Sequence, residues 1–194
     1  TYQAQALAAL VNQQGLTRVS TVVINNDYGV GFEQQFVESF EGLGGTVVNR
    51  DNPVRYEPRA TSLDTEAAAA FGGDAEGVAA VLNAETGSIL LQSAFKQGLS
   101  ENVTVFLTDG VFSPDFVEQV GKTADGKSII AGSLGTVPGA SGTGLDDFTA
   151  LWQASTGKEV SAFVPHTWDA TVLLMLAAEA AQSNTGEGIK NKIR

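Results

Sequence analysis

Acidic and aromatic side chains follow three apolar segments of the sequence, each at the point where a β-strand is expected to end. They are Asp27 and Tyr28 after residues 21–25, Glu85 after residues 78–82, and Asp109 after residues 103–107. In an open sheet of parallel strands, ligands bind outside the carboxyl ends of the strands. The spacing therefore predicts that these side chains share one edge of a sheet, where they receive a small polar ligand with a cationic group.

Each of these side chains also has a purely structural interpretation. Asp27 and Glu85 stand at the start of expected helices, where carboxylates cap free N–H groups, so capping and ligand contact both stay open for them. Asp109 lies four residues before Ser113, the expected cap of the next helix, so capping explains it less well. Tyr28 is either a packing residue at a helix start or an aromatic cover over a ligand.

The residue types give little support to catalysis. The three acids are potential oxygen ligands for Mg²⁺, which keeps a metal-assisted hydrolase as an alternative. However, no base, nucleophile or water-activating group accompanies them. His166, the only histidine, stands in no recognisable catalytic motif. Gly29 and Gly31 form only half of a dinucleotide fingerprint, because Gln34 stands where the third glycine is needed. We therefore expect no catalytic residue, no metal ligand, no cofactor and no enzymatic activity.

Composition narrows the class of protein further. The chain has 194 residues, 43% of them apolar, and a net charge of −11, which is typical of a globular protein that does not bind nucleic acid. It has no cysteine, which excludes disulfides and thiolate zinc sites. No apolar stretch reaches the ~20 residues that a membrane-spanning helix needs. The first residues lack Met and the features of a signal peptide, so we expect a chain that is processed or cut from a longer one.

Hydrophobic periodicity and turn residues predict alternating helices and strands. Helices are expected over residues 2–14, 29–43, 62–71, 85–97, 145–156 and 168–182, with another starting at Ser113, and strands over residues 19–25, 46–49, 78–82, 103–107 and 128–134. Residues 51–60 contain Pro53 and Pro58 and are expected to form a loop. The predicted fold class is α/β, a doubly wound, mostly parallel sheet flanked by helices.

Four segments together resemble the type I periplasmic binding proteins, and within them the branched-chain amino acid receptor group of ABC importers. The segments are residues 22–31 with their Tyr-Gly-x-Gly turn, residues 77–87 with Glu-Thr-Gly, residues 106–112 with Thr-Asp-Gly, and residues 163–170 with Trp-Asp-Ala, where the family usually has Tyr-Asp-Ala. The similarity extends over nearly the whole chain. Each motif alone is modest, whereas their order and spacing are fairly specific.

The resemblance implies a two-lobed protein that closes on a ligand held between its lobes. By position, Tyr28 matches an aromatic residue that packs over the ligand, and Asp109 matches an acid that pairs with the ligand's α-ammonium group. Asn83 and Ala84 fall in a loop that supplies another wall of the site. The candidate ligand-binding residues are Tyr28, Asp109, Asn83, Ala84, Glu85 and Asp27.

The function that this resemblance implies is that of a non-enzymatic, extracytoplasmic solute-binding component of an ABC importer. Its ligand is expected to be an amino acid or a similar small amine or amide, and its partner an ABC transporter permease. The localisation is expected to be periplasmic or extracytoplasmic, with a lipoprotein as one form of the precursor. The alternative is the ligand-sensing domain of a receptor.

The resemblance also implies a domain organisation. Residues 1–134 are expected to form a complete α/β lobe, residues 135–144 a crossover or hinge, and residues 145–194 helices of the other lobe. Because chains of the family are about twice as long, we expect this chain to be a fragment that lacks the N-terminal part of that other lobe. The apolar faces of the last helices would then be exposed and available for self-association; they include Leu151, Trp152, Leu173, Leu174 and Leu176.

Overall fold

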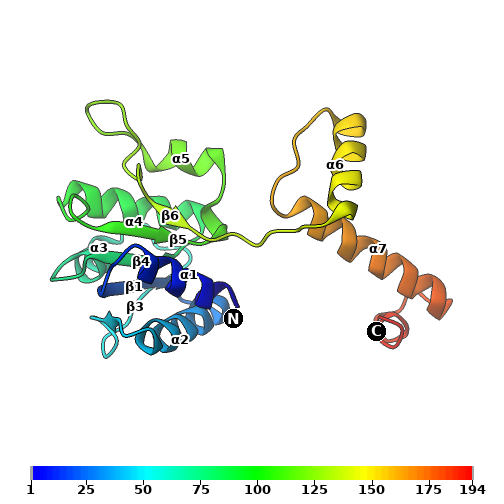
Figure 1. Ribbon diagram of the computed structural model, residues 1–194, viewed down its shortest axis with the longest axis horizontal. Helices are drawn as coiled ribbons and strands as arrows, with labels where there is room; N and C mark the ends of the chain where they lie inside the picture. The colour runs from blue at the N-terminus through cyan, green and yellow to red at the C-terminus, as the bar shows by residue number, and fades with distance from the viewer. Residues whose placement is uncertain (1, 194) are drawn as a thin grey trace. The chain divides into compact units, whose positions relative to one another are not determined.

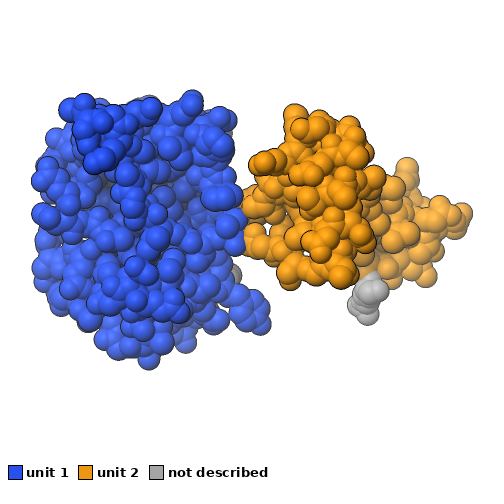
Figure 2. All heavy atoms as spheres, turned by 45° about the horizontal axis from the view of Figure 1, so that its top comes forward, with its two compact units in different colours: residues 1–137 blue, residues 138–194 orange. Residues whose placement is uncertain are grey.

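The computed structural model describes residues 2–193. The chain divides into two compact units, which we call the sheet unit, residues 1–137, and the helical unit, residues 138–194 (Figures 1 and 2). Each is described by itself below. The assignment of the two units to lobes of a larger protein stays a prediction.

The sheet unit is built on parallel strands in the order β2-β1-β4-β5-β6, with β3 also paired to β1. The strands are β1 Arg18–Ile24, β2 Thr46–Val47, β3 Val54–Tyr56, β4 Gly77–Val81, β5 Thr104–Leu107 and β6 Leu134–Gly135. Every residue of β4 is buried, as is every residue of β1 except Arg18. This arrangement explains why apolar residues predominate in both strands, because a central parallel strand is covered on both faces.

Helices cover both faces of the sheet (Figure 1). They are α1 Tyr2–Gln13, α2 Asp27–Gly42, α3 Asp64–Phe71, α4 Ala84–Lys96 and α5 Pro114–Val120. Helix α1 packs against α2, while α4 packs against both α3 and α5. The stripe of Phe32, Phe36 and Phe40 on α2 is fully buried in the core. The predicted fold class, a doubly wound and mostly parallel α/β sheet, is confirmed.

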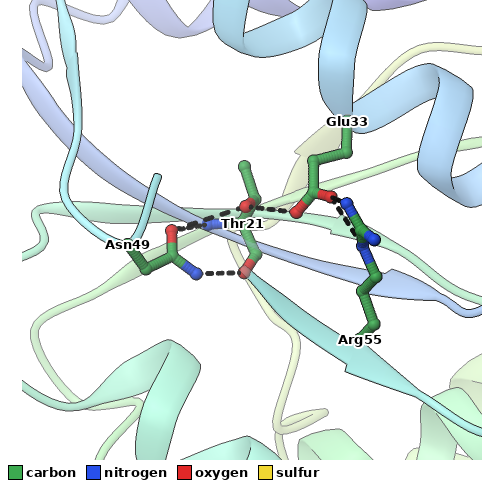
Figure 3. Close-up of polar contacts among 4 residues, drawn as sticks. All are labelled: Thr21, Glu33, Asn49 and Arg55. Atoms are coloured by element: carbon green, nitrogen blue, oxygen red, sulfur yellow. Dashed lines mark hydrogen bonds and ion pairs between the residues drawn. The ribbon is translucent and has the colours of Figure 1, made fainter. Parts of the chain in front are cut away.

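One edge of the sheet is shared by two short strands. Strand β2 pairs with Arg18 and Val19, and β3 pairs further along β1, with Val22 to Ile24. Between them the side chain of Asn49 takes the place of a strand. It accepts the N–H of Thr21 at 2.9 Å and donates to the Thr21 carbonyl at 2.7 Å (Figure 3). The backbone groups of β1 are therefore paired across the interruption.

Two predicted segments differ in the structure. Residues 51–60 are not only a loop, since they contain β3 between Pro53 and Pro58. Residues 128–134 are not a full strand: Ser128 forms an isolated bridge with Lys122, residues 129–132 form turns, and β6 comprises only Leu134–Gly135. The carbonyl of Ser128 accepts the N–H of Ala131 at 3.0 Å, a bond that closes such a turn.

The helical unit contains α6 Thr143–Thr156, α7 Val164–Ala181 and α8 Gly186–Lys190, the last of which the sequence did not predict. Phe148 joins α6 to α7, because its ring centre lies 6.0 Å from that of Trp152 and 5.6 Å from that of Trp168. Only Pro165 and Ala177 are buried in α7. Leucines of both helices are exposed; Leu151, Leu173, Leu174 and Leu176 have exposed fractions of 48–62%. None of the helices described over residues 2–193 has the length and apolar character of a membrane span.

Candidate functional site

The ends of β1, β4 and β5 lie side by side, as the sequence predicts, because these strands are neighbours and parallel. Two glycines let the following segments fold back onto the strand ends. A Cβ atom at Gly29 would lie 2.0 Å from the carbonyl oxygen of Ile24, and one at Gly110 would lie 2.4 Å from that of Leu82. Only glycine allows such close approach of backbone to backbone. The first turn of α2 and the 3₁₀ turn η1, Asp109–Val111, are thereby held at one edge of the sheet.

Tyr28, Asp109 and Gln3 form a hydrogen-bonded group at this edge, which we call the carboxylate cluster. The Tyr28 hydroxyl lies 3.2 Å from Oδ1 of Asp109 and 3.1 Å from Oε1 of Gln3, so its single proton is shared between two acceptors. The Gln3 amide donates to Asp109 Oδ1 and, at 3.1 Å, to the Thr136 carbonyl. Three distant parts of the chain therefore meet at one carboxylate.

The surroundings of Tyr28 keep its hydroxyl protonated. Burial, followed by the negative charge of Asp109, raises the pKa of Tyr28 to about 12. Tyr28 as a whole residue is 42% exposed. The cluster thus offers a neutral phenol that donates, an accessible aromatic face and a carboxylate, which together suit a ligand with a cationic amino group.

The loop between β4 and α4 is organised by Asn83 rather than by Glu85. The Asn83 side chain caps α4, because its oxygen accepts the N–H of Thr86 at 3.1 Å and also the Thr86 hydroxyl. Its backbone N–H donates to the hydroxyl of Tyr56 at 3.0 Å. Glu85 is exposed in the first turn, and Ala84, which is half-buried, begins the helix. The interpretation of Glu85 as the cap of α4 is therefore wrong, because Asn83, two residues earlier, is the cap.

Asp27 is likewise not the cap of its helix. The oxygen of the Asn26 side chain accepts the N–H of Gly29 at 2.8 Å, so Asn26 caps α2 and the exposed Asp27 follows it. Both Asp27 and Glu85 still lie in first turns, where a carboxylate is favoured by the helix dipole. In the described part of the chain, no hydrogen bond joins either of them to the carboxylate cluster.

The three predicted acids do not converge as metal ligands would. Within residues 2–193, no group of three or more His, Cys, Asp or Glu side chains is placed to hold a metal ion. The geometry therefore gives no support to the metal-assisted hydrolase alternative. His166 is exposed, and its Nδ1 lies 3.0 Å from the Ala162 carbonyl, one turn earlier.

Sequence reasoning missed two residues that organise this edge. Gln3 lies in α1, 106 residues from Asp109, and a glutamine at the start of an amphipathic helix carries no signal of such a contact. Tyr56 lies in the strand that the prolines concealed. Neither has a local sequence pattern that points to the site, so only the folded chain reveals them.

A largely apolar pocket of about 500 Å³ borders the carboxylate cluster within the sheet unit. It lies between the end of β5, the start of α5 and β6. Its lining includes Thr108, Val111, Phe112, Val117, Leu134 and Thr136. Thr108 precedes Asp109 in the chain and the Thr136 carbonyl accepts Gln3, so the pocket and the cluster adjoin.

Comparison with known proteins assigns the chain to a family. The model of the receptor family ligand binding region matches residues 1–194. The chain belongs to this family. No curated protein sequence matches the chain significantly.

Solved structures of similar fold agree with this membership in the receptor family ligand binding region. They include a leucine binding protein from Thermotoga maritima, with a TM-score of 0.80, 23% identity and coverage of 100% of this chain and 53% of that one. A branched-chain amino acid transporter substrate binding protein from Streptococcus pneumoniae, in complex with isoleucine, has a TM-score of 0.70, 20% identity and coverage of 98% and 52%.

A solute binding protein from Rhodopseudomonas palustris, in complex with p-hydroxybenzoic acid, has a TM-score of 0.75, 21% identity and coverage of 98% of this chain and 51% of that one. The fold is that of the type I periplasmic binding proteins, and the chain spans about half the length of these solved relatives.

Proposed function

We propose that this chain is part of a non-enzymatic solute-binding protein that takes an amino acid or a similar small amine or amide for an ABC importer. The observation that carries the proposal is the contact between Tyr28 and Asp109 at the carboxyl edge of the sheet. The similar solved structures include solute-binding components of ABC transporters, one with isoleucine and one with p-hydroxybenzoic acid.

Asp109 is the proposed partner of the ligand's ammonium group. A buried ammonium is stable only when a carboxylate pairs with it and its remaining hydrogen bonds are satisfied. In the structure, Asp109 Oδ1 accepts a hydrogen bond from the side-chain amide of Gln3. The ammonium group of a ligand would compete with this amide for the same carboxylate oxygen. Tyr28 supplies the aromatic cover, and the loop of Asn83 and Ala84 the neighbouring wall. The adjoining pocket suits an apolar side chain of the ligand.

The test is ligand binding by the full natural protein that contains this chain. Isothermal titration with L-leucine, L-isoleucine and 4-hydroxybenzoate separates ligands with an ammonium group from one without it. We expect Asp109→Asn to weaken binding of an amino acid by about 10- to 100-fold, the effect of losing a hydrogen bond between charged groups. Asp51→Asn is the control, because Asp51 is an exposed acid of the loop before β3 and not a candidate ligand-binding residue, so it should leave the dissociation constant within twofold. An Asp109→Asn variant that binds like the wild type rules the assignment out.

The second candidate is the ligand-sensing domain of a receptor, which the description of the matching family favours. The same pocket would serve both functions, so binding alone does not separate them. Transport does: uptake of the ligand by membrane vesicles that contain the cognate ABC permease should require the binding protein, whereas a receptor domain would leave uptake unchanged. The permease partner and the periplasmic or extracytoplasmic localisation are part of the first proposal. The comparisons offer no support for self-association through the last helices.

A further inference from the structure

Tyr56 is buried and is hydrogen-bonded to two segments of the candidate site. It is the last residue of β3 and its exposed fraction is 0%. Its hydroxyl accepts the backbone N–H of Asn83 at 3.0 Å, and its carbonyl accepts the backbone N–H of Asn25 at 2.8 Å. Asn25 leads into Asp27 and Tyr28, whereas Asn83 caps α4. One residue is therefore hydrogen-bonded to both the segment that follows β1 and the segment that follows β4.

The strand that carries Tyr56 is fixed on the opposite face by an ion pair between Arg55, which is partly exposed, and Glu33, which is buried. Arg55 donates from Nε and Nη2 to Oε2 of Glu33, at 3.0 and 2.8 Å, and Glu33 is only 3% exposed (Figure 3). The other oxygen of Glu33 accepts the Thr21 hydroxyl at 3.0 Å. Because successive side chains of a strand point to opposite faces, Arg55 holds β3 against α2 while Tyr56 reaches the loop before α4.

We propose that Tyr56 is a positioning residue of the ligand site, which acts through the backbone of Asn83. This inference rests on the proposed function, since it concerns the same site. Without the hydroxyl, the N–H of the half-buried Asn83 loses its acceptor, and a donor left unpaired away from water is unfavourable. The loop relieves that cost by moving its N–H toward water, which displaces the wall formed by Asn83 and Ala84.

The first experiment needs no ligand. Tyr56→Phe removes the hydroxyl and keeps the ring, so the fold is retained. We expect the amide of Asn83 to exchange its hydrogen at least tenfold faster in this variant. The amide of Asn25 should keep its protection, because its acceptor is the Tyr56 backbone carbonyl, and the amides of residues 78–81 should be unchanged. Equal protection of Asn83 in both proteins overturns the proposal, as does a loss of protection at all of these amides, which would indicate unfolding of the sheet instead.

The second experiment measures the ligand. In the full natural protein, Tyr56→Phe should weaken binding of whichever amino acid the wild type binds, L-leucine or L-isoleucine, by about tenfold. Thr21→Val is the control, because it removes another buried hydroxyl that touches neither loop; its dissociation constant should stay within twofold. Equal weakening by both variants, or none by Tyr56→Phe, contradicts a positioning role. If the wild type binds neither amino acid, the proposed function fails, and the exchange experiment still decides whether Tyr56 sets the loop.

Discussion

The hydroxyl of Tyr28 lies 3.2 Å from Oδ1 of Asp109, although 81 residues separate them in the chain. The contact follows from the parallel sheet, which places the ends of β1 and β5 on either side of β4. It brings a proton donor and a carboxylate together at the sheet edge, where the charge of Asp109 affects the pKa of Tyr28.

The first prediction concerns the ionisation of Tyr28. Asp109→Asn should lower the pKa of Tyr28 from about 12 toward its ordinary value of 10, since the negative charge is one of its causes. The shift should be incomplete, because burial, the larger cause, remains. Ultraviolet absorbance of tyrosinate against pH measures it, and Asp27→Asn serves as the control. An unchanged titration would show that the two side chains do not meet in solution.

The second prediction is the pH dependence of stability in alkali. Tyr28 has a raised pKa in the folded state, so the unfolded chain loses its proton first, near pH 10. The free energy of unfolding should therefore be level below about pH 10 and fall between pH 10 and about 12. Tyr56, whose pKa is also raised by burial, contributes with the same sign. Urea unfolding at several pH values should show a shallower fall for Tyr28→Phe than for the wild type; an equal fall contradicts the prediction.

The third prediction compares two glycines of one helix. A methyl group at Gly29 would lie 2.0 Å from the Ile24 carbonyl oxygen, whereas one at Gly31 meets nothing within 4 Å. Gly29→Ala should therefore push α2 away from the end of β1 and destabilise the sheet unit by roughly 2 kcal/mol or more. Gly31→Ala should stabilise it by up to about 1 kcal/mol, because alanine is the better helix former. Denaturant unfolding followed by circular dichroism distinguishes the signs, and destabilisation by both changes would refute the steric explanation.

The fourth prediction concerns the ion pair between Glu33, which is buried, and Arg55, which is partly exposed. Glu33→Ala removes the carboxylate partner of Arg55 and one of the two acceptors of the buried Thr21 hydroxyl, which should cost roughly 1–3 kcal/mol. Glu41 lies on α2, as Glu33 does, and forms a more exposed ion pair with Arg50. Glu41→Ala breaks this pair and should cost less than about 1 kcal/mol. Because both tryptophans, at 152 and 168, lie in the helical unit, circular dichroism is the measurement to use for the sheet unit. Similar losses in the two variants would mean that burial does not decide the strength of the pair.

The order of strands and helices could be predicted because each central strand ends in a short apolar run that a turn follows. The same pattern predicted correctly that the loops of Tyr28 and Asp109 lie at one edge of the sheet. The prediction of strands failed where the local composition and the tertiary contacts favour different structures. Strand β3 is three residues long beside a proline, and it exists because β1 offers it a partner. Ile129 and Ile130 suggested a strand, yet they pack against the core from turns.

The individual roles at the site were less predictable than its location. Acidic residues at helix starts suggested capping, whereas the asparagines beside them, Asn26 and Asn83, perform it. Both residue types are good caps, so composition alone does not choose between neighbours. Gln3 reaches Asp109 across the fold, and no spacing rule connects positions that far apart.

The side chain of Asn49, which stands in for a missing piece of strand, gives this protein a place where its chain can vary. The edge of the sheet stays paired although the chain leaves it after residue 48 and returns at residue 54. Residues 51–53 between them are exposed. Lengthening a loop costs only about 0.6 kcal/mol for each doubling. Evolution or protein engineering can therefore insert a peptide or a reporter domain here, while Asn49 and β3 keep the backbone of β1 hydrogen-bonded.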